Sequence, residues 1–323
     1  MRKLHWIPLL LIPVFLACSI DDDPGVNPPK EEVEFIDGTT IVFASQSEAQ
    51  KLLGTSDEYS KALTKFDIAS RTHSAANTKE QNYLDVAAAQ ALEWQENEIA
   101  VLTILINNIK DKMEDLNLDL NIPQRINLIK SSTQEEGGAV SYTRMDYIVA
   151  GGEVTEHYII HELFHLLTRY NPDKRDALYQ TINFEKSNRI EYPAAIVDRI
   201  ITNPDAPFLD HTIKLTINGQ QKEAVFILLA SRDYTGGSFF DYMQQKLMIV
   251  EGSANNKAPV LVNNMPVLHD FSEATDLKDK IGNNTAYTLH PEEILADHFV
   301  ALIKPNPAPS PAFIEAMQNV LTK

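Results

Sequence analysis

Two histidines, His161 and His165, stand four residues apart, with a glutamate, Glu162, directly after the first. On an α-helix, positions i and i+4 lie on one face one turn apart, so both imidazoles can present a ring nitrogen to one ion. Glu162 lies beside that face, where its carboxylate can take a proton from an activated water. The pattern is typical of a hydrolase that uses Zn²⁺. The alternative, two histidines in the core of an apolar helix, would leave Glu162 buried without a partner.

The segment that positions this motif has the pattern of a helix. Residues 153–170 contain neither Pro nor Gly, follow Gly151-Gly152 and precede Asn171-Pro172, which marks both helix ends. Residues 139–150 read as a strand that leads to this helix. We expect that strand to form the rim of a cleft and to pair with a substrate backbone; the alternative is a sheet strand with no role in substrate binding.

A catalytic zinc ion needs a third protein ligand as well as a position for water. Glu293 is the strongest candidate, because Glu293 and Asp297 are again four residues apart, on a helix that Pro291 opens. One carboxylate can bind the metal while the other orients a ligating imidazole. We expect Glu293 in the first role and Asp297 in the second, holding His161 or His165.

Other residues could supply the ligand instead. His157 lies one helical turn before His161, but it would crowd a site of three ligands, and we expect it to pack or to orient a neighbour. Glu191 is nearer to the motif in sequence, and Glu292 is adjacent to Glu293. We expect Glu292 to be a carboxylate that stabilises a helix N-terminus.

The two motifs together resemble the gluzincin group of metallopeptidases. In that group the third ligand is the first glutamate of Glu-x-x-x-Asp or Glu-x-x-Ala-Glu-x-Phe on a later helix, and residues 293–299 (EILADHF) fit the second form with Asp for Glu. The resemblance covers the two motif helices. It implies a zincin-like fold, a zinc ion and hydrolysis of peptide bonds. The connection from His165 to Glu293 is longer than gluzincins usually show.

Gluzincins use a Tyr or a His to stabilise the oxyanion that forms at the attacked carbonyl group. The resemblance therefore points to Tyr287 or His290, just before the glutamate ligand, with Tyr287 preferred. Either could instead be a loop residue. His298, next to Asp297, is expected on the opposite side of its helix.

The chain is also similar, over most of its length, to a group of uncharacterised lipoproteins of Bacteroidetes that resemble zinc peptidases. The similarity lies in the His161 motif with Arg169 and residues 171–172 (NP), and in residues 290–293 (HPEE). It names no substrate.

The first residues predict export and lipid anchoring. Residues 1–17 read as a signal peptide, too short and too rich in Pro for a spanning helix, and residues 15–18 resemble the lipobox that ends at a lipidated cysteine, here Cys18, the single cysteine. An ordinary secretory signal with an incidental cysteine is the alternative. Residues 18–40 are expected to be a flexible tether. The acidic run after Cys18 resembles a surface-export signal of Bacteroidetes, or is a solvated linker; we expect an outer-membrane lipoprotein.

The remaining residues, 41–323, suffice for a large core. The formal net charge of −17 makes nucleic acid an unexpected partner. Helical patterns cover residues 45–74, with Ser47, Ser56 and Asp57 as candidate caps, and residues 78–116. The part of the second region from Leu92 onward is expected to back the motif helix. Residues 125–130 read as a strand. Residues 171–282 are expected to form an inserted mixed subdomain, with helices at 173–183 and 193–201, strands at 211–218, 224–231 and 246–250, and a hairpin turn at Asn218-Gly219.

These patterns predict an α+β fold, zincin-like and mainly helical, with a small mixed sheet. The expected activity is that of a membrane-tethered zinc endopeptidase that acts on a peptide or protein substrate. Two alternatives stay open: a surface lipoprotein that binds ligands without catalysis, and a zinc amidase that acts on an amide outside proteins.

Overall fold

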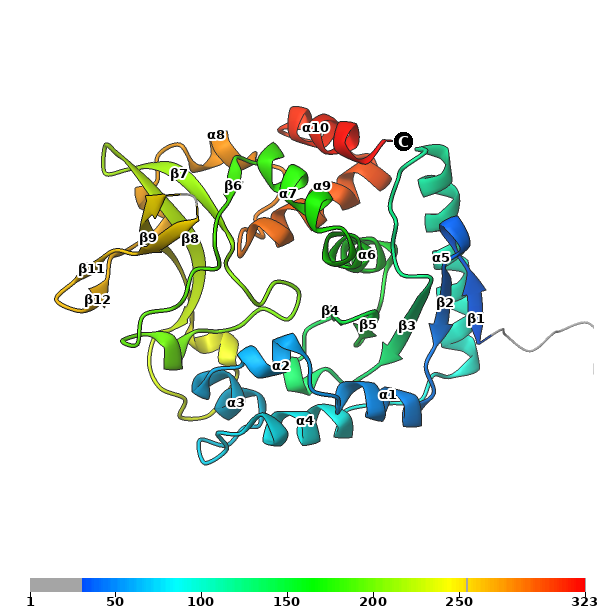
Figure 1. Ribbon diagram of the computed structural model, residues 1–323. Helices are drawn as coiled ribbons and strands as arrows, with labels where there is room; N and C mark the ends of the chain where they lie inside the picture. Colours follow the sequence, from blue (N-terminus) through cyan, green and yellow to red (C-terminus); the bar gives the residue numbers. More distant parts are fainter. Residues whose placement is uncertain (1–30, 254, 323) are drawn as a thin grey trace, which may run out of the picture.

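Figure 1 shows the computed structural model, which describes residues 31–253 and 255–322. The predicted signal peptide, the lipobox with Cys18 and residues 18–30 of the predicted tether lie outside the described residues. The fold is α+β, as predicted. Residues 32–34, which the tether prediction included, form the first strand of a sheet.

The central sheet has five strands in the order β1-β2-β3-β5-β4 (Figure 1). The three inner strands, β2, β3 and β5, are parallel, and the two edge strands are antiparallel to their neighbours. The strands are β1 (Glu32–Glu34), β2 (Thr40–Phe43), β3 (Arg125–Lys130), β4 (Ser141–Arg144) and β5 (Tyr147–Ala150). β4 is therefore an edge strand with one long side unpaired by backbone.

Alternate side chains of this sheet point to its two faces, and each face packs into a different hydrophobic core. Ile148 and Ala150 of β5 belong to the main core, while Tyr147 and Val149 belong to a smaller core on the other face. The main core includes the motif helix α6 (Glu156–Tyr170) and the long helix α5 (Glu96–Asp115), which contact each other. The prediction that the helix in the region from Leu92 onward backs the motif helix is thus confirmed.

The smaller core is covered by three short helices at the N-terminal end of the chain: α1 (Gln46–Leu53), α2 (Glu58–Ala62) and α4 (Glu80–Ala89). The helix between the last two, α3 (Lys65–Arg71), packs into another cluster through Phe66 and Ala69. Within the predicted helical region of residues 45–74, the expected cap at Asp57 is confirmed, and those at Ser47 and Ser56 are wrong. Ser45, Asp57 and Thr64 each cap a new helix with their side chains, because a short polar side chain can satisfy the exposed amides of a helix N-terminus.

A second sheet has the strand order β10-β9-β8-β7-β6, and β13 also pairs with β9. Its strands are β6 (Phe184–Lys186), β7 (His211–Ile217), β8 (Gln220–Ala230), β9 (Met243–Ser253), β10 (Asn256–Pro259) and β13 (Leu268–His269). Asn218 and Gly219 both have positive φ in the turn between β7 and β8, which confirms the predicted hairpin. A small hairpin, β11 (Leu261–Val262) and β12 (Met265–Pro266), projects from this sheet (Figure 1).

Helices α7 (Pro172–Thr181), α8 (Leu277–Ile281), α9 (Pro291–Ile303) and α10 (Pro311–Leu321) complete the fold. Of these, α9 packs along α6, and nearly all of its residues are buried. Short 3₁₀ turns lie at Ile36–Gly38, Gln134–Glu136, Val197–Arg199, Phe239–Tyr242 and Phe271–Glu273.

Two predictions along the chain are corrected. Residues 139–150 form a hairpin of two strands, β4 and β5, because Met145 between them adopts a positive φ of 44°. Residues 193–201 form only the 3₁₀ turn and not a helix. Of the described residues, none lies in a helix long and apolar enough to cross a membrane.

A buried ion-pair network joins α3 to the turn before β4. The Arg71 guanidinium lies 2.5 Å from Asp67 and 2.9 Å from Glu136, and both pairs are almost fully buried. Glu136 also accepts hydrogen bonds from the hydroxyls of Tyr59 and Tyr83. Since Arg71 is the one cation in ion-pair contact with both carboxylates among the described residues, its loss would leave two buried charges unpaired.

We therefore predict that Arg71→Met lowers the free energy of unfolding by about 3–5 kcal/mol, because removing one member of a buried ion pair leaves its partners uncompensated. Lys65 lies on the same helix as Arg71 and forms an exposed ion pair with Asp198. Lys65→Met is therefore the matched control and should lower the free energy of unfolding several-fold less. Urea denaturation measures both. Equal destabilisation by the two variants would contradict this account of the network.

Candidate metal and active site

Helix α6 brings the three motif side chains to one buried place. His161, Glu162 and His165 are 9%, 2% and 1% exposed, and the two imidazole rings lie 4.8 Å apart, edge to face. The chain reaches this helix through two glycines. A Cβ atom on Gly151 would meet the Thr133 side chain at 2.6 Å, and Gly152 adopts a φ of +63°, which favours glycine.

Helix α9 places Glu293 against these histidines. Its Oε2 atom lies 3.0 Å from His161 Nε2 and 3.7 Å from His165 Nε2. Ligands that surround a zinc ion tetrahedrally at 2.0–2.2 Å are about 3.4 Å from one another. The two distances from Glu293 Oε2, 3.0 and 3.7 Å, lie on either side of that value. The ligand atoms of the three residues all lie within 4.8 Å of one another, so the group could hold a metal ion.

Two buried polar atoms at this place have no hydrogen-bond partner, His165 Nε2 and Glu162 Oε2. A buried polar atom left unpaired is costly in free energy. A cation beside His165 Nε2 and a water beside Glu162 would satisfy both. These unpaired atoms, together with the ligand spacing, fit a zinc ion held by His161, His165 and Glu293.

Each histidine is oriented by a different carboxylate of α9. His161 Nδ1 lies 3.1 Å from Asp297 Oδ1, and His165 Nδ1 lies 3.0 Å from Glu292 Oε1. Such contacts fix which ring nitrogen faces the metal. The structure thus brings Asp297 to His161, and it gives Glu292 a role that the sequence did not indicate.

Glu292 is held in place by two further donors, the hydroxyls of Thr168 at 2.5 Å and of Tyr179 at 2.6 Å. Burial alone would raise the pKa of Glu292, but its bonds to His165, Thr168 and Tyr179 outweigh burial and lower it. The carboxylate is therefore an anion aimed at His165. Tyr179 and Thr168 come from α7 and α6, which explains why no local pattern around Glu292 reveals this role.

The charges of the site are strongly shifted. Burial and the nearby Asp205 carboxylate raise the pKa of Glu162 to about 7. Burial would lower the pKa of His165, but Asp205 and Glu293 outweigh it and raise that pKa to about 9. Burial would raise the pKa of Glu293, but the two histidines lower it to about 2. Shifts of this kind in one buried cluster are typical of functional sites.

Glu162 has a direct partner on the edge strand. The hydroxyl of Ser141, on β4, donates a hydrogen bond of 2.7 Å to Glu162 Oε1. The other oxygen is the unpaired one. One oxygen is thus held while the second is available to a water molecule, the arrangement that a general base requires.

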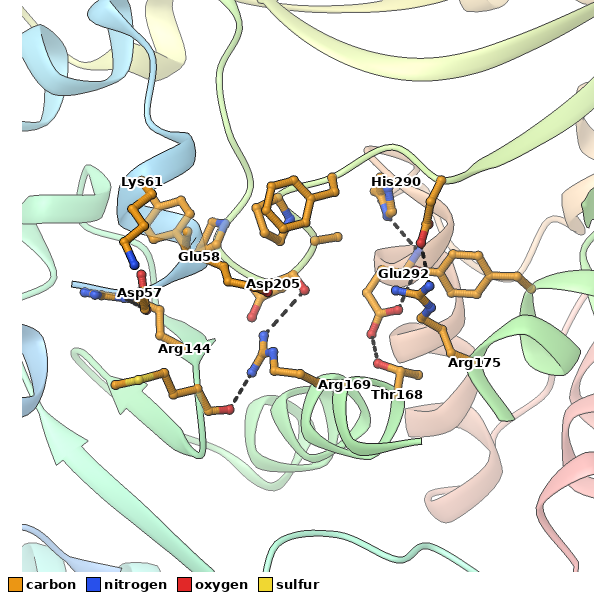
Figure 2. Close-up of a pocket in the computed structure, with 18 of the residues that line it drawn as sticks. Asp57, Glu58, Lys61, Arg144, Thr168, Arg169, Arg175, Asp205, His290 and Glu292 are labelled. Atoms are coloured by element: carbon orange, nitrogen blue, oxygen red, sulfur yellow. Dashed lines mark hydrogen bonds and ion pairs between the residues drawn. The ribbon is translucent and has the colours of Figure 1, made fainter. Parts of the chain in front are cut away.

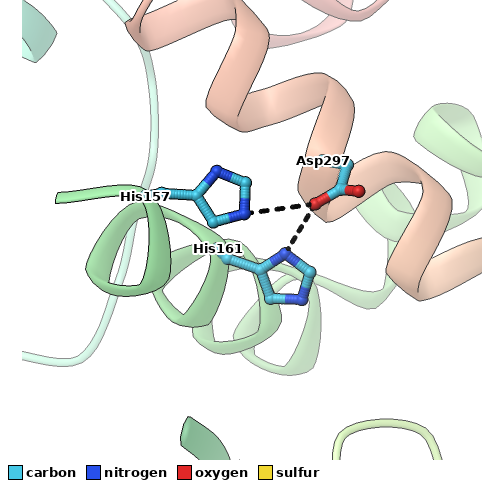
Figure 3. Close-up of side chains that lie close together, drawn as sticks. All are labelled: His157, His161 and Asp297. Atoms are coloured by element: carbon cyan, nitrogen blue, oxygen red, sulfur yellow. Dashed lines mark hydrogen bonds and ion pairs between the residues drawn. The ribbon is translucent and has the colours of Figure 1, made fainter. Parts of the chain in front are cut away.

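His157 lies beside the same cluster but at its outer side (Figure 3). Its Nε2 atom is 3.7 Å from Asp297 Oδ1, and its side chain is 48% exposed. Asp297 thus lies between His157 and the Nδ1 atom of His161, as Figure 3 shows. Because His161 Nδ1 is the nitrogen that faces away from Glu293, His157 contacts an orienting carboxylate and not the three-ligand group.

Tyr287 lies within reach of the site, since its ring centroid is 6.2 Å from that of His161. Desolvation and the carboxylates of Glu293 and Asp205 raise the pKa of its phenol. The hydroxyl therefore stays protonated at neutral pH and can donate a hydrogen bond. Tyr287 also lines a cavity with Ser141 and Asp205.

His290 lies at the N-terminus of α9, where its Nδ1 atom accepts a hydrogen bond from the amide of Glu292 at 3.1 Å. Burial lowers its pKa to about 4, so the ring is neutral and acts as a helix cap. Glu191 is exposed and pairs with Arg189 at 3.5 Å. His298 is buried, and its ring lies against Phe313.

The loop of residues 202–208 enters the site from the connection between β6 and β7 of the second sheet. Asn203 Nδ2 donates to Glu293 Oε1 at 2.5 Å. Asp205 lies beside Glu162 and His165, and the ligand atoms of these three side chains are within 4.8 Å of one another. Sequence reasoning missed this loop. The signal that could have found it is the pair Pro204 and Pro207 around a single acidic residue, which is typical of a rigid loop.

Two cavities adjoin the loop. One, of about 90 Å³, is lined by Ser141, Asn203, Asp205 and Tyr287 and by apolar side chains that include Leu228, Phe239 and Met243. The other, of about 400 Å³, lies on the far side of the loop and is lined by Arg169, Arg175 and Glu292 (Figure 2). Asp205 borders both, so the loop divides them.

Comparison of the chain with protein-family models, curated protein sequences and solved structures finds no match.

We predict that Glu292→Gln weakens zinc binding by roughly 10- to 100-fold, because it removes the anion that orients His165. Glu191→Gln, at an exposed carboxylate, is the matched control and should bind zinc as the wild type does. Competition with a chromogenic chelator measures both affinities. An unchanged affinity in Glu292→Gln would show that the contact to His165 does not support metal binding.

Proposed function

We propose that this chain is a zinc-dependent peptidase in which His161, His165 and Glu293 hold the ion. The observation that carries the proposal is the placement of three ligand atoms at zinc-like spacing beside Glu162, a buried carboxylate with one oxygen unpaired. When bound, a zinc ion supplies a Lewis acid that polarises the substrate carbonyl and makes a nearby water more acidic.

Glu162 would act as the general base. The Ser141 hydroxyl holds Oε1, so Oε2 is the oxygen that accepts a proton from the attacking water. The water oxygen then adds to the carbonyl carbon, and the same carboxylic acid returns the proton to the amine that leaves.

The remaining side chains would position the substrate and the charge that develops on it. Tyr287 would donate its phenolic hydrogen to the oxyanion, a role that its protonated hydroxyl supports. His290 is a weaker candidate, since its Nδ1 atom already caps α9. Asp297 and Glu292 would keep His161 and His165 in the tautomers that face the ion.

The setting of the site supports a peptide as the substrate. β4 is an edge strand beside Glu162, and an extended peptide can add to such an edge through its backbone. An inner parallel sheet, an antiparallel edge strand and a motif helix next to it also support a zincin-like arrangement. The lipoprotein signal and its acidic run support a tether to the bacterial outer membrane as the place of action.

The proposal predicts that Glu162→Gln keeps zinc but lowers the rate of peptide hydrolysis by at least about 100-fold, because it removes the base and leaves the three ligands intact. Bound zinc is measured by elemental analysis, and cleavage is followed by mass spectrometry on a set of synthetic peptides. Glu191→Gln serves as the control. Full activity of Glu162→Gln would contradict the mechanism, and absence of cleavage by the zinc-loaded wild type would contradict the proposed function.

A further inference from the structure

One end of the space beside Glu162 is closed by the loop of residues 202–208. This loop lies against the unpaired side of β4, where the amide and the hydroxyl of Thr143 both donate to Asp205 Oδ1, at 2.7 and 2.6 Å. A peptide that adds to an edge strand uses such outward amides. Beyond Ser141, therefore, the edge is already occupied by the protein's own Asp205.

The closing loop is fixed at three points and is not a flap. Thr202 accepts a hydrogen bond from Arg71 through its carbonyl oxygen at 2.9 Å and donates its hydroxyl to Asp67 at 2.6 Å. Asn203 bonds Glu293, and the amide of Asp205 donates to the Asn203 side chain at 3.0 Å. The buried network of Arg71 thus anchors the loop of residues 202–208, which forms the wall at the closed end of the cleft.

The wall carries one carboxylate, that of Asp205, which lies near His165. Within residues 31–253 and 255–322, no Lys or Arg nitrogen makes an ion pair with it. Arg169 donates instead to the Thr143 hydroxyl at 2.8 Å, to the Met145 carbonyl oxygen at 3.1 Å and to the backbone carbonyl oxygen of Asp205 at 3.5 Å. Only Oδ1 of Asp205 is engaged by Thr143. A cationic group on the substrate would complement this carboxylate.

The direction of β4 says which end of a peptide meets the wall. β4 runs from Ser141 to Arg144, and its closed end is the Thr143 end. A peptide that adds antiparallel to β4 places its N-terminal end opposite the C-terminal end of the strand. The end of the substrate that faces Asp205 is then the one that bears a free α-ammonium group.

From the closed cleft, the free carboxylate and the strand direction, we infer that this enzyme is an aminopeptidase whose Asp205 binds the α-ammonium group of the substrate. The inference rests on the proposed function and narrows it from cleavage within a chain to removal of the N-terminal residue.

The distances leave room for one residue before the bond that is cut. Side-chain ligand atoms of Asp205, Glu162 and His165 all lie within 4.8 Å of one another, and an extended chain advances about 3.3–3.6 Å per residue. Water adds to the carbonyl carbon of the first residue, and the C–N bond to the second residue breaks. The released amine takes the proton that Glu162 accepted from the water, giving one free amino acid and a peptide one residue shorter.

The cavity of about 90 Å³ adjoins both Asp205 and Ser141, and its lining also includes the apolar side chains of Leu228, Phe239 and Met243. Such a cavity accepts a small or medium apolar side chain.

The test compares synthetic peptides of identical sequence with a free or an acetylated N-terminus, incubated with the zinc-loaded full chain and analysed by mass spectrometry. We expect free peptides to lose N-terminal residues one at a time and acetylated peptides to stay intact. Asp205→Asn should lower kcat/KM on free peptides by roughly 10- to 100-fold, because it removes one charge-assisted contact. Asp115→Asn, at an exposed carboxylate of α5, is the matched control and should leave kcat/KM unchanged.

A binding measurement separates recognition from turnover. With zinc-loaded Glu162→Gln, which should bind without cutting, calorimetry should give at least a tenfold weaker affinity for the acetylated peptide than for the free one, and the added Asp205→Asn change should abolish the difference. Internal cleavage of free and acetylated peptides alike would overturn this inference and leave the proposed function standing. No cleavage of either peptide by the wild type would overturn both.

Discussion

The packing of α9 against α6 is the constraint on which the site depends. Three carboxylates of α9 face two imidazoles of α6: Glu293 lies between the inward nitrogens of His161 and His165, while Asp297 and Glu292 each contact one outward nitrogen. Burying so many ionisable groups is costly unless each finds a partner. The helices can therefore pack closely only in a register that pairs them, and that register also sets the spacing of the proposed zinc ligands.

A second buried ion-pair network positions the loop of residues 202–208 and the turn before β4. Asp67, Arg71 and Glu136 tie α3 to the turn before β4, and Arg71 and Asp67 also hold Thr202. The loop that follows contacts Glu293 through Asn203 and the edge strand through Asp205. Elements far apart in the sequence thus meet at this loop, and Arg71, on α3 and outside the two helices that carry the proposed zinc ligands, holds it in position.

Local patterns predicted the elements with a strong periodic signal. The strand at residues 125–130 has the bounds of β3, the motif helix begins three residues later than predicted, and the hairpin turn at Asn218-Gly219 is present. They failed where a single residue decides the outcome. Met145 turns one predicted strand into two, and Ser45 and Thr64 cap helices although neither was predicted as a cap.

The candidate site also contains residues that local sequence patterns could predict and residues that they could not. His161 and His165, and Glu293 and Asp297, could be predicted because each of these two pairs lies one helical turn apart, and Glu162 because it adjoins His161. The structure brings all five together. Glu292 and Asp205 could not, because their partners come from other parts of the chain: Tyr179 and Thr168 for the first, Thr143 for the second. Spacing reveals groups on one helix, whereas a wall or an orienting contact between distant segments appears only in three dimensions.

Anomalous diffraction at the zinc absorption edge, from crystals of the zinc-loaded protein, tests the central claim most directly. The account predicts one peak within about 2.0–2.2 Å of His161 Nε2, His165 Nε2 and a Glu293 carboxylate oxygen. A peak on the outer side, at His161 Nδ1 with His157 and Asp297, or no peak between α6 and α9, would contradict it.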